Sequence, residues 1–335
     1  MQRIYNYGSF LQAYALKKMM EECGAEVEFV DYHPGECILP SKETTGMKRK
    51  IQKGLEILRM KGRLRDKIQF VKYKKNYARK NYPVLGLKET YNYAPKLDLL
   101  VIGSDEVFNC IQDNSNVGFA PELFGAGHQA NRLISYAASF GNTTLESLKK
   151  YQVADQVAQW LRAFDALSVR DENSRKIVQE LIGKDPVCHL DPVLAYDYPA
   201  KLPETKAKIP HDPYMILYGY SGRFNKEEAG EIRKYAKRKG LKILCIGGIQ
   251  RCGDKFIDCS PFEIFEYFKH AESVVTDTFH GTIFSVVTQK KFATFVRKNG
   301  YGNSEKLTDL LKRLGLERQT VTDILRVPRW CWIVP

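Results

Sequence analysis

The stretch that decides the fold runs Val274-Val275-Thr276-Asp277-Thr278-Phe279-His280-Gly281-Thr282-Ile283-Phe284-Ser285. A β-branched apolar pair leads into small polar residues and then into an apolar run through Val287, which predicts a buried strand, a turn and a helix. In a parallel α/β sheet, ligands bind where strands end and helices begin, because backbone N–H groups and the helix dipole favour an anion there. His280 is therefore expected to bind a phosphate, move a proton, or both. The alternative is that it only caps or packs the helix.

The same alternation of strands and helices extends along most of the chain. The predicted strands are 26–30, 97–102, 134–141, 166–170, 187–190, 215–218 and 241–246. The predicted helices are 10–22, 145–164, one ending at Leu181, 226–239, 261–269 and 305–314. Strands that alternate with helices indicate an α/β protein with parallel, helix-covered sheets.

The length of 335 residues exceeds the usual size of one hydrophobic core, so we expect two domains. Three prolines lie among polar residues in 203–213 and mark the clearest linker candidate. We predict an N-terminal Rossmann-like domain over 1–200, a linker over 201–213 and a C-terminal Rossmann-like domain over 214–335, facing each other across a cleft. The last helix could cross back to the first domain.

The positive charge is concentrated in one segment. Between Lys48 and Lys80 there are 14 Lys or Arg residues against Glu56 and Asp66, which accounts for +12 of the formal net charge of +13. Apolar residues at helical spacing in this segment predict a basic amphipathic helix or helix pair, inserted at about 46–80. Its face either packs on the body of the protein or contacts an anionic surface, such as lipid headgroups or a lipid-linked polyanionic substrate. No recognised motif accompanies the charge, so nucleic acid is not the expected partner.

Cysteine usage and the start of the chain favour a reduced, cytoplasmic protein. Cys245, Cys252 and Cys259 are seven residues apart, which is not a zinc-ligand spacing, and no CxxC occurs. The first residues lack the apolar core of a signal peptide, and no run is long enough to span a bilayer. We expect no metal and no resident cofactor.

Other strand-end turns also carry polar groups. Residues 6–9 (Asn-Tyr-Gly-Ser) precede a helix and could present backbone N–H groups to an anion, or form a plain turn and cap. Asp105, in Gly103-Ser104-Asp105, could bind a sugar hydroxyl or act as a base, or it could form an Asx turn. Arg170 could bind a phosphate or carboxylate group of a ligand, or it could form a surface salt bridge with Glu172.

These motifs, taken in order, resemble the polysaccharide pyruvyl transferase family. The resemblance covers the chain from Tyr5 to about Leu314, outside the basic insertion and the linker. It rests on Asn6-Tyr7-Gly8 with Leu11–Leu16, Val101–Asn109, Ser135–Gly141, Ser168–Glu172, Asp191–Leu194 and Thr276–Gly281. It implies a fold similar to GT-B glycosyltransferases, with the active site between the domains. It also implies transfer of the enolpyruvyl unit of phosphoenolpyruvate to a sugar, usually forming a pyruvate ketal on a cell-surface polysaccharide repeat unit such as that of a bacterial capsule or exopolysaccharide.

The resemblance assigns expected roles to the turn residues. The expected catalytic residues are His280 and Asp105. His280 is expected to act as a general acid or to bind the phosphate. Asp105 is expected to be the carboxylate that interacts with the sugar hydroxyl. The expected donor-binding residues are Arg170, Ser221, Thr278, His280 and Gly281. The expected acceptor-binding residues are Asn6, Tyr7, Gly8, Ser104, Asp105, Asn109 and Ser139. The expected partners are phosphoenolpyruvate as co-substrate and a saccharide acceptor that is linked to lipid at the inner face of the plasma membrane.

The chain departs from the family pattern in two places. Thr278 stands where some relatives carry a basic residue, so we expect different donor recognition. Only Met1–Tyr5 precede the Asn6 turn, where relatives have a full strand, so we expect either a truncated start or another segment in that place, with Trp330–Val334 as a candidate. Two other functions stay open: a glycosyltransferase of similar fold that uses a nucleotide sugar, and an inactive homologue that binds a polyanionic glycan or membrane.

Overall fold

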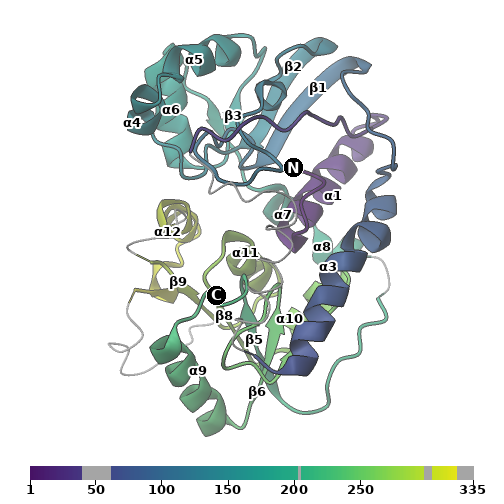
Figure 1. Cartoon of the computed structure of the whole chain (residues 1–335), viewed down its shortest axis with the longest axis vertical. Helices are drawn as coiled ribbons and strands as arrows, with labels where there is room; N and C mark the ends of the chain where they lie inside the picture. The colour runs from purple at the N-terminus through teal and green to yellow at the C-terminus, as the bar shows by residue number, and fades with distance from the viewer. Residues whose placement is uncertain (40–61, 203–204, 298–303, 323–335) are drawn as a thin grey trace, which may run out of the picture. The chain divides into compact units, whose positions relative to one another are not determined.

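The computed structural model describes residues 1–39, 62–202, 205–297 and 304–322 (Figure 1). Two compact units can be distinguished by their internal contacts. Unit 1 comprises residues 1–4, 9–42 and 82–196, and unit 2 comprises residues 5–8, 43–81 and 197–335. The short segment 5–8 and the described residues 62–81 therefore group with the C-terminal half, although the predicted domain boundaries placed both in the first domain.

Unit 1 contains a parallel sheet in the order β1-β2-β3-β4. Its strands are β1 (Lys96–Asp105), β2 (Gln129–Ala138), β3 (Ser168–Val169) and β4 (Val187–Cys188). Its helical elements are most of α1 (Tyr7–Glu22), η1 (Pro121–Phe124), α4 (Leu145–Lys150), α5 (Ala154–Arg162), α6 (Glu172–Ile182) and α7 (Pro192–Ala195). The expected order of helices and strands is confirmed here, except at the two places described below and at the short elements η1 and α7, which were not predicted.

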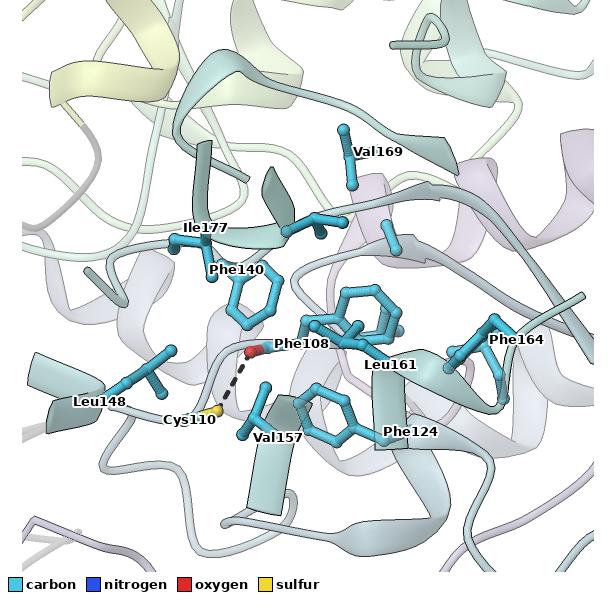
Figure 2. Close-up of a cluster of buried hydrophobic side chains, with 14 of the residues drawn as sticks. Phe108, Cys110, Phe124, Phe140, Leu148, Val157, Leu161, Phe164, Val169 and Ile177 are labelled. Atoms are coloured by element: carbon cyan, nitrogen blue, oxygen red, sulfur yellow. Dashed lines mark hydrogen bonds between the residues drawn. The ribbon is translucent and has the colours of Figure 1, made fainter. Parts of the chain in front are cut away.

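The core of unit 1 is built from aromatic and aliphatic side chains (Figure 2). Phe108 is fully buried and stacks on Phe124 at a ring-centroid distance of 4.9 Å. The ring centroid of Phe140 lies 5.3 Å from that of Phe108. Val157 and Leu161 of α5 are also fully buried in this cluster. Burial of such side chains stabilises the unit by roughly 1.5–3 kcal/mol for each one.

Two predictions for unit 1 were wrong. The strand predicted over 26–30 is absent, since those residues carry no strand assignment. They line a cavity of about 580 Å³, together with α1 and residues 99–103 of β1. Among the described residues β1 pairs only with β2, and residues 26–30 have no neighbouring strand to satisfy their backbone groups. Leu99, which lines the same cavity, is 37% exposed.

The single helix predicted over 145–164 is two helices. α4 ends at Lys150 and α5 begins at Ala154, and Gln152 between them has a φ of 56°. A residue in the left-handed region cannot continue a helix. The apolar periodicity persists across the break because both helices pack against the same core, which explains why the sequence pattern hid it.

Unit 2 contains a second parallel sheet, in the order β10-β9-β8-β5-β6-β7. Its strands are β5 (Tyr214–Tyr218), β6 (Lys242–Ile246), β7 (Lys255–Phe256), β8 (Ser273–Thr276), β9 (Phe292–Phe295) and β10 (Thr320–Val321). Its helical elements are α8 (Tyr198–Lys201), α9 (Lys226–Lys239), α10 (Glu263–His270), α11 (Phe279–Val287), α12 (Ser304–Arg313) and η2 (Glu317–Gln319). The chain is thus a mixed α/β protein with parallel sheets, as predicted.

The described part of the basic segment forms helix α3 (Leu64–Leu85), which confirms the predicted helix from Leu64 onward. The first part of the predicted insertion, 46–61, and the segment Trp330–Val334 lie outside the described residues. Within the described residues, no helix has the length and apolar character needed to cross a bilayer.

Candidate functional site

The carboxyl edge of the sheet in unit 2 gathers several polar turns. Strands β8, β5 and β6 run parallel and are adjacent in that order, so the residues that follow Tyr218, Ile246 and Thr276 emerge at the same edge. The turns after β5 and β6 are joined by hydrogen bonds, since Ile249 N donates to Ser221 Oγ at 2.9 Å. This edge is where open α/β sheets bind ligands.

The turn after β8 leads directly into helix α11. Thr278 is its N-cap, and the Thr278 side chain accepts a hydrogen bond from Gly281 N at 3.0 Å. Thr276 Oγ1 lies 3.0 Å from Thr278 Oγ1 and holds the capping hydroxyl in place. The first turn of α11 is buried, with His280 only 9% exposed. The opening stretch of the sequence therefore folds as predicted, with His280 at the positive end of a helix dipole.

His280 lies directly against Gly8. A Cβ atom built on Gly8 would stand 2.2 Å from both Cγ and Nδ1 of the His280 ring, so only glycine allows this approach. The turn before Gly8 is fixed by Asn6, whose Oδ1 accepts from Gly8 N at 2.7 Å and whose Nδ2 donates to the Tyr220 hydroxyl at 2.7 Å. Two motifs that are 272 positions apart in the sequence thus meet within unit 2.

Two arginines converge on Asp277, the residue before the cap of α11. Arg223 Nε donates to Asp277 Oδ2 at 2.8 Å, and Arg297 Nε approaches the same oxygen at 3.4 Å. Arg297 also pairs with Glu228 at 2.5 Å. Burial alone would lower the pKa of Arg297, but its hydrogen bond to Glu228 and the charges of Glu228 and Asp277 raise that pKa above its ordinary value. The Arg297 guanidinium therefore stays charged beside the helix N-terminus.

Gln250 completes this edge. It is 1% exposed and its Nε2 donates to Tyr220 O at 2.6 Å, which ties the turn after β6 to the turn after β5. A Cβ on Gly248 would lie 2.3 Å from Ser221 N, so glycine is needed for this close approach. The turn that carries Ser221 is therefore fixed from two sides.

The polar residues predicted in unit 1 form a buried ion network at the end of its sheet. Arg170 follows β3, is 3% exposed and donates to Asp191 Oδ2 at 2.7 Å. It also approaches Asp105 Oδ1 at 3.7 Å, and Asp105 Oδ2 accepts from Ser9 Oγ at 2.9 Å. Arg170 is thus no surface residue, and the suggested salt bridge to Glu172 does not form. Burial alone would lower the pKa of Arg170, but Asp191 and Asp105 outweigh burial and raise it.

The remaining predicted acceptor residues of unit 1 make structural hydrogen bonds. Asn109 donates to Glu106 and Asn142 and accepts from Ile111 N and Thr143 Oγ1. Ser139 Oγ donates to Asp171 Oδ2 at 2.5 Å and accepts from Gly141 N at 3.0 Å. Ser104 Oγ accepts from Asp105 N at 2.6 Å. Their expected contact with a sugar stays a prediction.

The structure therefore brings together part of the predicted site. Within unit 2 it joins the turns that carry Asn6–Gly8, Ser221 and Thr278–Gly281. Arg170, Ser104, Asp105, Asn109 and Ser139 belong to unit 1 and are described there alone. Sequence reasoning missed Arg223, Gln250, Asp277 and Arg297. A signal existed for Arg223, which lies two residues after the predicted donor residue Ser221, whereas Arg297 follows a strand that was not predicted.

Within the described parts of the chain, no cluster of three or more His, Cys, Asp or Glu side chains is arranged to hold a metal ion.

Comparison with known proteins gives one match that covers most of the chain. The sequence model of a family described as polysaccharide pyruvyl transferase matches residues 6–299. Among curated protein sequences, none matches this one.

Several solved structures are similar at low sequence identity. A UDP-GlcNAc 2-epimerase from Neisseria meningitidis bound to UDP-GlcNAc is 9% identical with a TM-score of 0.42, over 73% of this chain and 83% of that one. MnaA from S. aureus in complex with UDP is 12% identical with a TM-score of 0.40, over 68% and 71% of the two chains. An O-GlcNAc transferase mutant from Thermobaculum terrenum is 12% identical with a TM-score of 0.37, over 68% of this chain and 43% of that one. The chain therefore spans less than half the length of that transferase.

Proposed function

Because this chain belongs to the polysaccharide pyruvyl transferase family, we propose that it transfers the pyruvyl unit of phosphoenolpyruvate to a saccharide and forms a pyruvate ketal on it. The family is one of transferases that act on polysaccharides, as its name states. The donor, the ketal product and the linkage of the acceptor to lipid are our proposal.

The reaction sets clear demands on the protein. A proton is added to the methylene carbon of the donor, and a sugar hydroxyl oxygen forms a bond to the adjacent carbon as the hydroxyl proton leaves. A second hydroxyl then forms the other C–O bond as its proton leaves, and the bond to phosphate breaks, so that inorganic phosphate is released carrying that proton. The protein must bind a phosphate and a carboxylate together and must supply a proton.

The observation that carries the proposal is the contact between His280 and Gly8 at the N-terminus of α11. A helix N-terminus favours a phosphate through its dipole and its backbone N–H groups. His280 in the first turn can donate a proton to the donor or to the leaving phosphate. Arg223, with 17% of its side chain exposed, supplies a charged guanidinium at the same sheet edge.

Donor recognition would then differ from that of relatives with a basic residue at position 278. In this chain Thr278 caps α11, and the positive charges next to the cap come from Arg223 and Arg297 on Asp277. We propose that Arg223, rather than residue 278, neutralises the donor. Asp105 as the base for the sugar hydroxyl and Arg170 as a donor ligand remain proposals, and the ion pairs of Arg170 give it a structural role as well.

The test is phosphate release from phosphoenolpyruvate in the presence of a panel of sugar acceptors. We expect His280→Asn to lower the rate at least about 100-fold, because general acid–base catalysis is worth about 10²–10⁴. His270→Asn is the matched control, since His270 is an exposed histidine of α10 in the same unit. Unchanged phosphate release in His280→Asn would remove His280 from the mechanism.

A binding measurement separates the proposal from its alternatives. Thermal stabilisation by phosphoenolpyruvate supports the proposed donor. Stabilisation by a nucleotide sugar and not by phosphoenolpyruvate would favour a glycosyltransferase instead. Binding of a polyanionic glycan without turnover of either donor would favour an inactive glycan-binding protein.

A further inference from the structure

Helix α3, labelled in Figure 1, has one face that packs against other residues of unit 2 and another that carries exposed side chains. Its inner face consists of Asp66, Phe70, Tyr73 and Tyr77, all of them buried. Phe70 packs edge-on against Phe256 at a centroid distance of 5.4 Å, and Asp66 Oδ1 accepts from Phe256 N at 3.1 Å. These contacts anchor the helix in a fixed orientation and leave its opposite face outward.

The outward face carries an apolar stripe. Leu64, Ile68 and Val71 are 71%, 51% and 41% exposed, at i, i+4 and i+7. This spacing puts them in one row on the helix. The sequence pattern allowed this row to be the packing face, but the structure packs a different row inward. A row of aliphatic side chains on an exposed helix face costs solubility and marks a contact surface.

Positive charges border this stripe. Arg65, Lys72 and Lys75 are exposed, and none of them forms an ion pair with a carboxylate of the described residues. Asp66 is the acidic residue of α3, and it points inward to Phe256. The outer face therefore combines uncompensated positive charge with exposed aliphatic side chains.

We propose that the outer face of α3, defined by Leu64, Arg65, Ile68, Val71, Lys72 and Lys75, binds an anionic phospholipid surface. The aliphatic stripe enters the boundary between headgroups and acyl chains, and the three cations contact lipid phosphates. This combination distinguishes a lipid surface from a soluble polyanion, which would pair with the cations and leave the aliphatic stripe in water.

The inner face of α3 connects this surface to the candidate site. Tyr77 Oη donates to Asn6 O at 2.8 Å, and Lys74 Nζ donates to Tyr5 O at 3.0 Å. The same helix therefore carries the proposed lipid surface on one face and contacts the turn beside His280 with the other. The proposal does not depend on the donor, so it can hold even where the proposed reaction fails.

The test is co-sedimentation of the full chain with phosphatidylcholine vesicles, with and without phosphatidylglycerol. We expect binding only to the anionic vesicles, and weaker binding at high salt because the charges are screened. The variant R65Q/K72Q/K75Q should bind about 100-fold more weakly, since each cation near the surface contributes about 1 kcal/mol. The matched control is K237Q/R238Q/K239Q, which removes the same charges from the exposed end of α9.

A second variant separates lipid from soluble polyanions. We expect L64Q/I68Q/V71Q to lose at least tenfold in vesicle affinity while its retention by dextran sulfate stays unchanged. Thermal unfolding of each variant checks that the fold is intact, as all six side chains are exposed. The proposal is overturned if the wild-type chain ignores anionic vesicles, if the α9 variant weakens binding as much as the α3 variant, or if L64Q/I68Q/V71Q binds vesicles like the wild type.

Discussion

The position of a single glycine decides how close the two most distant motifs of unit 2 can come. Gly8 has no Cβ, and the His280 ring occupies the space that a Cβ would fill. The sequence indicates both residues as parts of turns that could bind a ligand. Gly8 comes just before one predicted helix, and His280 lies at the start of another. The sequence does not indicate their contact, since nothing local relates residue 8 to residue 280.

We predict that Gly8→Ala lowers transfer activity about 100-fold and destabilises the protein by roughly 1–3 kcal/mol, because the added methyl group overpacks a buried site. The new methyl group displaces His280, and a shift of about 1 Å at a catalytic group costs about this much. In a helix, alanine is otherwise favoured over glycine by roughly 0.5–1 kcal/mol, so a loss of activity without unfolding identifies the displaced ring. Activity is read by phosphate release and stability by thermal unfolding.

The control for this change is Gly230→Ala in α9, where a Cβ meets no atom within 4 Å. It should leave activity near the wild-type value and raise stability by roughly 0.5–1 kcal/mol, the helix preference for alanine. Wild-type activity in Gly8→Ala would mean that the His280 ring has no fixed catalytic position.

At the scale of elements, Arg170 joins three parts of unit 1. It follows β3, and its partners are Asp191, the N-cap of α7, and Asp105, the last residue of β1. All three side chains are buried, so each charge depends on the others for compensation. Sequence reasoning recognised the residues as strand-end groups, but it could not show that they neutralise one another.

We predict that Arg170→Gln destabilises the protein by roughly 3–5 kcal/mol, because it leaves Asp191 and Asp105 buried without their cation. Chemical denaturation measures the free energy of unfolding. Arg132→Gln, an exposed arginine of β2, should change that free energy by less than about 0.5 kcal/mol. An Arg170→Gln variant of wild-type stability but without activity would instead assign Arg170 to ligand binding alone.

Long periodic elements were predictable, and short or unpartnered ones were predictable only in part. α9 was predicted with its observed bounds because Asn225 caps it, Gly240 ends it and its apolar positions repeat at helical spacing. Strands of two to four residues were predicted only in part, since β3, β4 and β8 were found but β7, β9 and β10 were missed. Residues 26–30 were predicted to form a strand because apolar and polar residues alternate there. The structure shows no strand at these residues, which border a cavity.

At the scale of the whole molecule, the family assignment and the two parallel sheets agree with the fold class inferred from the sequence. The contact-based units differ from the predicted domains in one informative respect. Residues 5–8 and α3 up to Asn81 group with the C-terminal residues, so the N-terminal motif contributes to the edge that carries His280. Linear order could not reveal this, because it places the motif next to unit 1.

The central claim is that the chain moves a pyruvyl unit from phosphoenolpyruvate to a sugar. The most direct measurement is carbon-13 NMR of the reaction with phosphoenolpyruvate labelled at the carbon that bears the phosphate. The account predicts that the label moves from the enol signal to a quaternary ketal signal on the acceptor, with release of phosphate. Label that stays in phosphoenolpyruvate, or appears only as free pyruvate, with every acceptor that the protein binds would contradict the account.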